Sequence, residues 1–313
     1  MDLIADIGAT NTRCALLDDE GRARAPEVFA NAEFAGIEDV LRKYLEHHRS
    51  LDRPRRAALA IAAPVLADDV EMLNIDWRFS QTELKASMNL SALLVVNDFA
   101  AVARALPALR PSDYAQVGGG QPALSAPLVV LGPGSGLGVA SLIPSPDGWT
   151  AVSSEGGHVT LAATTLDEAA AIQRIRENTG HCSAERVLSG PGLVRLYATL
   201  AELDGRTVPA VAAADVTRLA RQGEPLAGKT LSMFFAFLGT VAGDLALTLG
   251  ARGGAYIAGG IVPPLVDLLQ ISGFRARFVS KGRYTEYLES TPTRVITGPL
   301  PAFGGLRVLL GYR

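Results

Sequence analysis

The chain contains one short pattern twice: an apolar segment, a glycine-containing turn and a returning apolar segment. The first copy occupies residues 3–17 and the second residues 128–143, so that Gly8 and Gly134 lie 126 positions apart. Each copy predicts a strand, a tight turn and an antiparallel strand, with glycine and asparagine of the first turn in the left-handed backbone conformation. One weak repeat indicates two similar domains, although two unrelated hairpins would also look alike at this level.

Strand-like and helix-like segments alternate through the rest of the chain. Strands are expected at residues 57–63, 93–96, 254–262 and 294–297. Helices are expected at residues 33–48, 100–106, 165–180, 226–250 and 304–310, and another helical region is expected to begin at 183–190. This alternation implies mostly parallel sheets and an α/β fold. Residues 107–127, rich in proline, glycine, alanine and serine, are the best candidate for the crossing between two domains.

The segment Leu93–Phe99, with the sequence LLVVNDF, places an amide and a carboxylate directly after four apolar residues. Such an apolar run is typical of a strand that is buried on both faces. Open α/β sheets bind their ligands at the carboxyl ends of the strands, so Asp98 is a candidate general base. The alternative is that Asp98 caps the helix that follows, a position that aspartate favours.

The composition excludes several classes of protein. The formal net charge is −3 and no long basic run occurs, so the chain lacks the charge pattern of a nucleic-acid-binding protein. Its two cysteines, Cys14 and Cys182, form no disulfide framework or cysteine-rich zinc site and fit a reducing compartment. The N-terminus lacks the basic segment of a signal peptide. Asp244 interrupts the apolar stretch 233–249, which favours a core helix over a membrane span. We expect a cytoplasmic protein.

The first turn lies in the segment Asp6–Arg13, with the sequence DIGATNTR. Backbone N–H groups around such a glycine turn form concave sites for phosphates and other anions. Asp6, at the end of the strand, is placed to hold a metal ion through water. An ordinary tight hairpin is the alternative.

The glycine-rich segment Gly132–Gly138 invites a dinucleotide-binding interpretation, which the residues do not support. Leu137 stands where the pattern G-x-G-x-x-G requires its last glycine, and the segment leads into a strand instead of a helix. A second phosphate-binding turn fits better.

A third glycine-containing segment, Gly223–Thr230, matches the nucleotide P-loop pattern G-x-x-x-x-G-K-T. That motif requires a buried strand directly before it. The preceding residues, 215–222, are polar and have a helical period instead. We therefore expect Lys229 to take no part in nucleotide binding.

Glu155 and His158 are separated by two glycines, a spacing similar to that of metal ligands. The glycines disfavour the helix that usually presents such ligands. A polar pocket for a hydroxylated ligand is the better interpretation, and a glycine-rich structural turn is the alternative. Glu185, taken alone, is typical of a residue that complements a helix dipole.

Seven segments, in this order and spacing, resemble one protein family. They are DIGATNTR, NDF, LGPGSGLGVA, EGGHV, AERVLSGPGL, AYIAGGIV and SGFRARFVSKGR. Essentially the whole chain is similar to the proteobacterial type of ATP-dependent glucokinase, in the superfamily of sugar kinases, heat-shock proteins and actin. The resemblance implies a two-domain α/β fold, actin-like and ribonuclease H-like, with an interdomain cleft. Residues 1–108 and 298–313 would form the small domain and residues 109–297 the large one.

The resemblance also implies the roles of individual residues, with Asp98 as the catalytic base. The residues that resemble sugar ligands are Asn97, Asp98, Glu155, His158 and Glu185. The residues that resemble ATP contacts are Asp6, Gly8, Ala9, Thr10, Asn11, Gly134, Ser135, Gly136, Gly259 and Gly260. Ala9 stands where the family usually has glycine, and its methyl group is expected to crowd the phosphates.

The implied activity is phosphorylation of D-glucose at the 6-hydroxyl, with Mg-ATP as the donor, at the entry to glycolysis. The implied products are glucose 6-phosphate and ADP, and the implied assembly is a homodimer. The alternatives are a kinase for another hexose, including an N-acetylated one, and a non-catalytic actin-like sugar sensor. Asp98 distinguishes a kinase from a sensor, because a sensor has no need of a general base there.

Overall fold

The computed structural model describes residues 1–72, 75–146 and 148–312 and divides into two compact units. Unit 1 consists of residues 1–110, 145–153 and 298–313, and unit 2 of residues 111–144 and 154–297. The short segment 145–153, which the sequence assigned to the larger domain, groups with unit 1. The chain therefore leaves unit 1, returns to it briefly, and ends in it.

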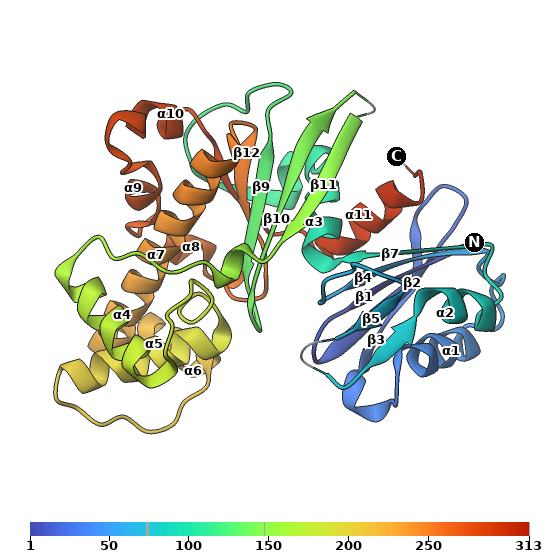
Figure 1. The fold of residues 1–313 in the computed structure, drawn as a ribbon, viewed down its shortest axis with the longest axis horizontal. Coiled ribbons are helices and arrows are strands. Elements are labelled where there is room, and N and C mark those ends of the chain that lie inside the picture. The colour runs from blue at the N-terminus through green and yellow to red at the C-terminus, as the bar shows by residue number, and fades with distance from the viewer. Residues whose placement is uncertain (73–74, 147, 313) are drawn as a thin grey trace. The chain divides into compact units, whose positions relative to one another are not determined.

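Unit 1 is built on a mixed sheet with the strand order β3-β2-β1-β4-β7 (Figure 1). The strands are β1 (Asp2–Ile7), β2 (Asn11–Leu17), β3 (Ala23–Ala30), β4 (Arg56–Ile61) and β7 (Ala92–Asn97). β1 pairs antiparallel with β2 and parallel with β4, which is parallel to β7. Strands β5 (Asp69–Glu71) and β6 (Arg78–Ser80) form a separate antiparallel pair.

Four helices supply the apolar partners of this sheet. Helices α1 (Ile37–His47) and α2 (Gln81–Ser87) bury residues in the core that contains the apolar side chains of β1. Helices α3 (Asp98–Ala105) and α11 (Pro301–Leu309) pack against each other and against β4. They approach so closely that a Cβ at Gly305 would overlap the carbonyl oxygen of Ala101. This contact holds the last helix of the chain in unit 1.

The second sheet has the strand order β11-β10-β9-β12-β13-β8. Its strands are β8 (Tyr114–Gly118), β9 (Leu128–Pro133), β10 (Leu137–Ser145), β11 (Gly148–Ser154), β12 (Gly254–Ile257) and β13 (Thr293–Ile296). All six residues of β9 are buried, so this strand is the centre of the unit 2 core.

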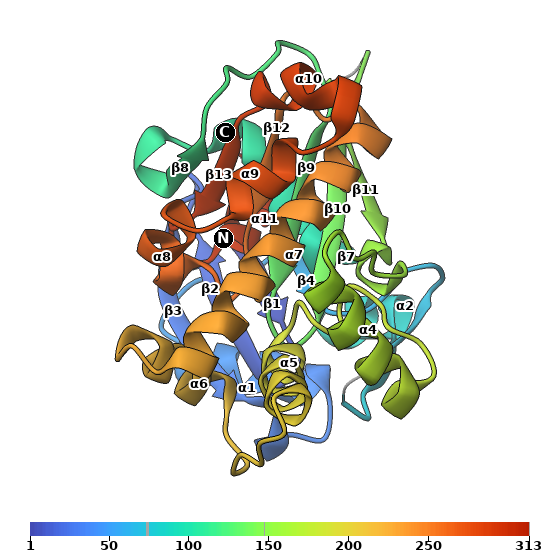
Figure 2. The ribbon, with the colours of Figure 1, turned by 90° about the vertical axis from the view of Figure 1, so that its left-hand side faces the viewer.

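The long helix α7 (Pro225–Leu249) packs against β9 and β12 and most extensively against three helices of unit 2 (Figure 2). Those helices are α5 (Gly190–Leu203), α6 (Ala213–Arg221) and α9 (Phe274–Val279). The remaining helices of unit 2 are α4 (Leu166–Thr179), α8 (Val266–Gln270) and α10 (Thr285–Glu289). α7 is long and apolar enough to cross a membrane, yet 72% of its most apolar window is buried inside the protein. It is therefore the core helix that the sequence predicted.

The repeat seen in the sequence is confirmed by the topology of the two sheets. The order β3-β2-β1-β4-β7 corresponds to β11-β10-β9-β12-β13, and β8 is an added antiparallel edge strand. In both sheets the first pair of the repeat is antiparallel and the next two pairings are parallel. The two units thus share one strand arrangement.

Some elements differ from their predicted limits. The helix expected at 33–48 begins only at Ile37, because the residue before it has extended backbone. The strand expected at 254–262 ends at Ile257, shortly before Gly259 enters the left-handed region with φ 82°. No local pattern of apolar residues marks either boundary.

β7 is not buried on both faces, as its apolar sequence predicted. It is one of the two edge strands of the unit 1 sheet, and Leu94 is 36% exposed. Helices α2 and α3 contact it and cover part of its surface. The apolar run therefore indicated a strand correctly, whereas the predicted burial on both faces is wrong.

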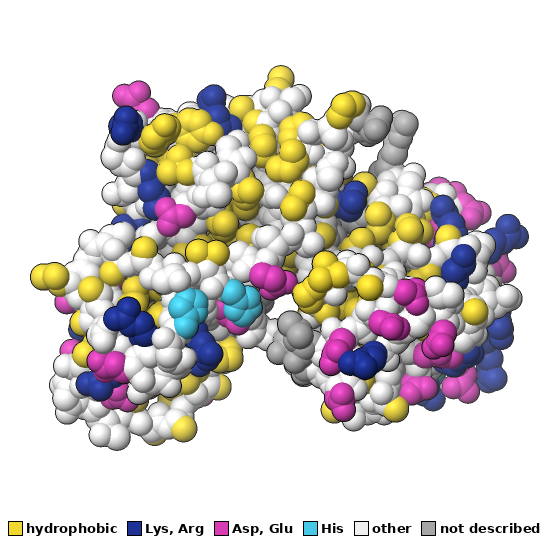
Figure 3. Space-filling model, in the orientation of Figure 1, with side chains coloured by type: hydrophobic (Ala, Val, Ile, Leu, Met, Phe, Trp, Pro, Cys, Tyr) yellow, Lys and Arg dark blue, Asp and Glu magenta, His cyan; other side chains and the backbone are white. Residues whose placement is uncertain are grey.

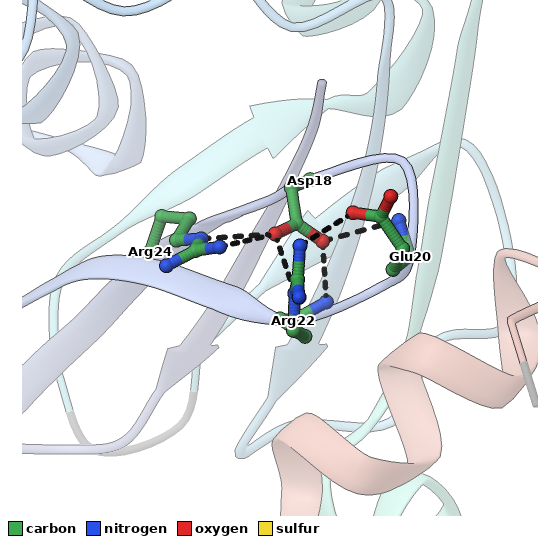
Figure 4. Close-up of polar contacts among 4 residues, drawn as sticks. All are labelled: Asp18, Glu20, Arg22 and Arg24. Carbon is green, nitrogen blue, oxygen red and sulfur yellow. Dashed lines mark hydrogen bonds and ion pairs between the residues drawn. The ribbon is translucent and has the colours of Figure 1, made fainter.

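The turn between β2 and β3 is held by a compact group of charged residues (Figure 4). The Asp18 carboxylate accepts from the Arg22 and Arg24 side chains at 2.9 Å each, and from the Arg22 backbone N–H at 2.9 Å. The Arg22 guanidinium also donates to Glu20 at 2.7 Å.

On the face shown in Figure 3, basic side chains are scattered among acidic ones without a continuous basic patch.

Candidate active site

The turn between β1 and β2 consists of Gly8, Ala9 and Thr10, and a hydrogen bond from the Gly8 N–H to the Asn11 carbonyl closes it at 3.0 Å. Residues 8–11 lie outside the left-handed region that the sequence predicted for glycine and asparagine here. A Cβ at Gly8 would make an ordinary contact of 3.4 Å with the Asn11 carbonyl. Glycine here therefore keeps the turn surface uncrowded and is not needed for a positive φ.

A buried side chain that the sequence analysis did not identify holds this turn. Asn31, 1% exposed, donates from Nδ2 to the Gly8 carbonyl at 2.8 Å and accepts from Thr12 Oγ1 at 2.8 Å. Its backbone N–H donates to the Thr10 carbonyl at 2.9 Å. Buried amides are retained when their hydrogen bonds are made, so this network fixes the path of the turn.

Asp6 is the penultimate residue of β1, with a side chain that is 20% exposed and lies 3.6 Å from the Arg13 guanidinium. Burial raises the pKa of Asp6, and the nearby Arg13 opposes that rise. Among the described residues no group of three or more His, Cys, Asp or Glu is arranged to hold a metal ion. A single carboxylate fits the other common arrangement, in which Mg²⁺ is bound by one or two carboxylates, water and substrate phosphates.

β7 ends at Asn97, which is the N-cap of α3. Its Oδ1 accepts from the backbone N–H groups of Phe99 at 3.0 Å and Ala100 at 3.1 Å, while its Nδ2 donates to the Ala63 carbonyl at 3.3 Å. The alternative assignment of Asp98 as the cap is therefore wrong. The Asp98 carboxylate, in the first turn of α3, accepts from the Phe99 N–H at 2.8 Å.

The register of the parallel strands brings the groups of unit 1 together. Ile7 of β1 pairs with Ile61 of β4, and Ile61 pairs with Asn97 of β7. Neighbouring strands are separated by about 4.8 Å, so the ends of β1 and β7 are roughly 10 Å apart. Asp98 and the turn 8–10 therefore lie at the same end of the sheet, where the parallel strands have their carboxyl ends.

The turn between β9 and β10 has the same length as the first and consists of Gly134, Ser135 and Gly136. The Gly134 N–H donates to the Gly136 carbonyl at 2.8 Å. Gly259, which follows β12, packs so closely that a Cβ there would overlap the Pro133 carbonyl oxygen. The ATP contacts that the resemblance assigned to unit 2 are thus adjacent.

Three predicted sugar ligands also come together within unit 2. His158 Nε2 lies 3.9 Å from Glu155 Oε2 and 3.9 Å from Glu185 Oε1. These separations are too long for direct hydrogen bonds, and they suit a ligand that contacts all three side chains. The side chains of Glu155 and His158 are more than half exposed.

Glu185 does not occupy the helix start that the sequence predicted for it. Residues 184–189 form turns, and α5 begins only at Gly190. The Glu185 carboxylate instead accepts from the Leu137 backbone N–H at 2.8 Å, directly after the second glycine turn. Dipole complement is therefore the wrong explanation for this residue.

The P-loop-like segment has the structure expected of a coincidental match. α6 precedes it, Glu224 caps α7, and Lys229 lies within α7. Lys229 forms an exposed ion pair with Asp204 at 3.3 Å. The segment therefore consists of the N-cap region and first residues of a helix, without the strand that a P-loop requires.

Comparison with known proteins agrees with these features. The glucokinase family model matches residues 3–312. A glucokinase of Paramagnetospirillum magneticum is 46% identical over 99% of this chain and 97% of its own length. The bifunctional protein glk of Paraburkholderia xenovorans is 44% identical over 98% of this chain, which spans 48% of that relative.

A crystal structure of glucokinase from an Antarctic psychrotroph superposes with a TM-score of 0.87, at 37% identity and with 98% of each chain covered. The two-unit α/β sugar-kinase fold that the resemblance implied is thereby confirmed. The strand register, the paired glycine turns and these matches together establish that the chain belongs to the glucokinase family.

Proposed function

We propose that the chain transfers the γ-phosphoryl group of ATP to the 6-hydroxyl of D-glucose, giving glucose 6-phosphate and ADP at the entry to glycolysis. Membership of the glucokinase family supports the substrate and the donor. The observation that carries the chemistry is the strand register of unit 1, which places Asp98 and the first glycine turn at the same carboxyl end of the parallel strands.

Asp98 acts as the general base in this proposal. Its carboxylate accepts the proton of the 6-hydroxyl while that oxygen forms a bond to the γ-phosphorus and the bond from γ-phosphorus to the bridging oxygen breaks. Because Asn97 caps α3, the Asp98 side chain is not required for that cap. Its position in the first helical turn sets its direction on a rigid element.

The two glycine turns bind the phosphates through backbone N–H groups. Contacts come from Gly8, Ala9, Thr10 and Asn11 of the first turn and from residues 134–136 of the second. Backbone dipoles held in place before the reaction stabilise the charge that develops on the phosphoryl oxygens. Gly259 and Gly260 contact the adenosine portion of the nucleotide.

Asp6 holds Mg²⁺ through water in this proposal. The bound ion supplies positive charge that neutralises the phosphate oxygens. The partly buried carboxylate of Asp6, whose pKa is raised by its surroundings, gains a favourable neighbour when a cation is present.

The sugar is held by hydrogen bonds from Asn97, Asp98, Glu155, His158 and Glu185. Carboxylate and imidazole groups suit the hydroxyls of a hexose. A site that hydrogen-bonds each hydroxyl rejects analogues that lack one, because its own polar groups are then left unpaired. The Asn97 amide already caps α3, so it contributes through its remaining donor capacity.

We also propose that the enzyme is a cytoplasmic homodimer, as the family resemblance implies. The two free, buried cysteines fit a reducing compartment. Sedimentation velocity at micromolar concentration measures the assembly directly, and a single species of 32.8 kDa would contradict the dimer.

A coupled assay of ADP release and glucose 6-phosphate formation tests the function. We expect turnover with Mg-ATP and glucose, and lower kcat/KM for mannose, N-acetylglucosamine and fructose. A higher kcat/KM for another hexose would replace glucose as the substrate. Sugar binding without ADP release would identify a sensor instead of a kinase.

A further inference from the structure

The segment 184–190 holds the second glycine turn at both of its ends. The Glu185 carboxylate accepts from the Leu137 N–H at 2.8 Å, after the turn. The Gly190 N–H donates to the Gly134 carbonyl at 2.8 Å, at the start of the turn. A hydrogen bond to an ionised acceptor is stronger than a neutral one, so the contact made by Glu185 dominates this pair.

The position of the Glu185 carboxylate is fixed by its surroundings. The backbone N–H of Glu185 donates to the Gly157 carbonyl at 2.8 Å. Its Oε2 lies so near the turn that a Cβ at Gly136 would be 2.5 Å from it. Glycine at position 136 therefore makes room for the carboxylate, in addition to leaving space for a phosphate.

The other oxygen of the same carboxylate faces the sugar ligands. Oε1 lies 3.9 Å from His158 Nε2, and that nitrogen is 3.9 Å from Glu155. The Glu185 side chain is 32% exposed, so a ligand beside His158 can reach it. One oxygen of this carboxylate therefore accepts from the residue after the second glycine turn, and the other lies near His158.

We propose that Glu185 is a positioning residue for the nucleotide turn as well as a sugar ligand, so that nucleotide affinity depends on it even when no sugar is present. This inference rests on the proposed function, in which the turn 134–136 binds ATP phosphates. A sugar hydroxyl that donates to Oε1 polarises the carboxylate that holds Leu137. The two substrates therefore influence each other's binding, and that coupling is reciprocal.

Sugar-free binding of the non-hydrolysable ATP analogue AMP-PNP, with Mg²⁺, tests the inference by calorimetry. Glu185→Ala removes the acceptor of the Leu137 N–H, and we expect Kd to rise about tenfold, equivalent to about 1.4 kcal/mol. Glu185→Gln keeps an oxygen that accepts from Leu137 but removes the charge, so its Kd should rise less than that of the alanine variant. Glu155→Ala is the matched control, since it removes a carboxylate of the sugar pocket that has no hydrogen bond to the turn among the described contacts.

Glu185→Asp gives an independent check if the alanine variant unfolds. It retains the charge but withdraws the oxygen from the Leu137 N–H, so it should weaken AMP-PNP binding as alanine does. Unchanged AMP-PNP affinity in folded Ala and Asp variants, combined with weaker glucose binding, would overturn the inference and leave Glu185 as a sugar ligand only. Failure of the original chain to bind AMP-PNP would overturn the proposed function itself.

Discussion

The two glycine turns have the same length and the same place in equivalent sheets, but they are held differently. Asn31, a neutral and almost fully buried amide, holds the turn 8–10 together with Thr12. Glu185, charged and partly exposed, holds the turn 134–136 through Leu137. The first turn is therefore a fixed part of the unit 1 core. The second depends on a group that also lies near His158, a proposed sugar ligand.

The strand ends of the two units differ in chemistry as well. Asp6 in unit 1 corresponds to Gly132 in unit 2 under the 126-residue offset of the repeat. In unit 1, Asp98 directly follows strand β7. In unit 2, Thr297 directly follows the equivalent strand β13. Unit 1 thus carries both carboxylates proposed for catalysis and metal binding. A shared topology therefore positions the turns, and local substitutions decide which unit performs the chemistry.

The largest expected effect is a difference in kcat between substitutions of the residues that follow β7 and β13. Asp98→Ala should lower kcat by at least ~10²-fold, the low end for loss of general acid–base catalysis. Thr297→Ala, at the exposed residue that follows β13 in unit 2, should leave kcat within about twofold. Steady-state kinetics with glucose and Mg-ATP measures both. Normal turnover in a folded Asp98→Ala variant would refute the assignment of the base.

The second effect concerns the buried amide of the first turn. Asn31→Ala leaves the Gly8 carbonyl without its donor, and an unsatisfied buried group costs ~1–3 kcal/mol. We expect KM for ATP to rise about tenfold while KM for glucose stays within about twofold. Thr12→Val, which removes only the hydroxyl that donates to Asn31, should shift KM for ATP in the same direction by less.

Val40→Ala is the control for this effect, because it removes a buried side chain of α1 without touching the turn. It should lower the melting temperature and leave KM for ATP unchanged. If all three variants lower stability alike and none changes KM for ATP, then Asn31 supports only the fold. The difference between the two turns would then have no functional meaning.

The sequence predicted the repeated turns and the parallel strands because both depend on local patterns of apolar residues and glycines. It did not predict Asn31, which lies 19 residues from Thr12 and 23 from Gly8 and belongs to no recurring motif. It also predicted that β7 is buried on both faces, whereas this edge strand is only partly covered. Long-range hydrogen bonds and strand order arise from tertiary packing, which these local patterns do not specify.

A smaller expected effect concerns the protein's stability and the carboxylate of Asp6, which has glycine, Gly132, as its counterpart in unit 2. A folded pKa raised by burial means that the stability associated with Asp6 is fully present below its unfolded pKa, about 3.9, and is lost as pH rises through the folded pKa. Asp6→Asn should therefore raise the melting temperature at pH 7 in the absence of nucleotide, on the order of 2 °C. The difference should disappear below about pH 4.

Asp19→Asn is the matched control, since it neutralises an exposed carboxylate of the same unit. It should shift neither the melting temperature nor its pH dependence. Asp6→Asn should also raise the Mg²⁺ concentration needed for half-maximal activity. A variant that is more stable yet needs no more Mg²⁺ would show that Asp6 has no role in metal binding.

The smallest expected effect concerns the segment that matches a phosphate-binding motif without sharing the structure of the two turns. Lys229 lies within α7, pairs with Asp204 at 3.3 Å, and is preceded by a helix where a P-loop requires a strand. An exposed ion pair contributes ~0–1 kcal/mol, so Lys229→Ala should change stability little. KM for ATP should remain within about twofold. A tenfold increase, equivalent to about 1.4 kcal/mol, would mean that residues 223–230 bind nucleotide and that a strand–turn–strand is not required for phosphate binding in this chain.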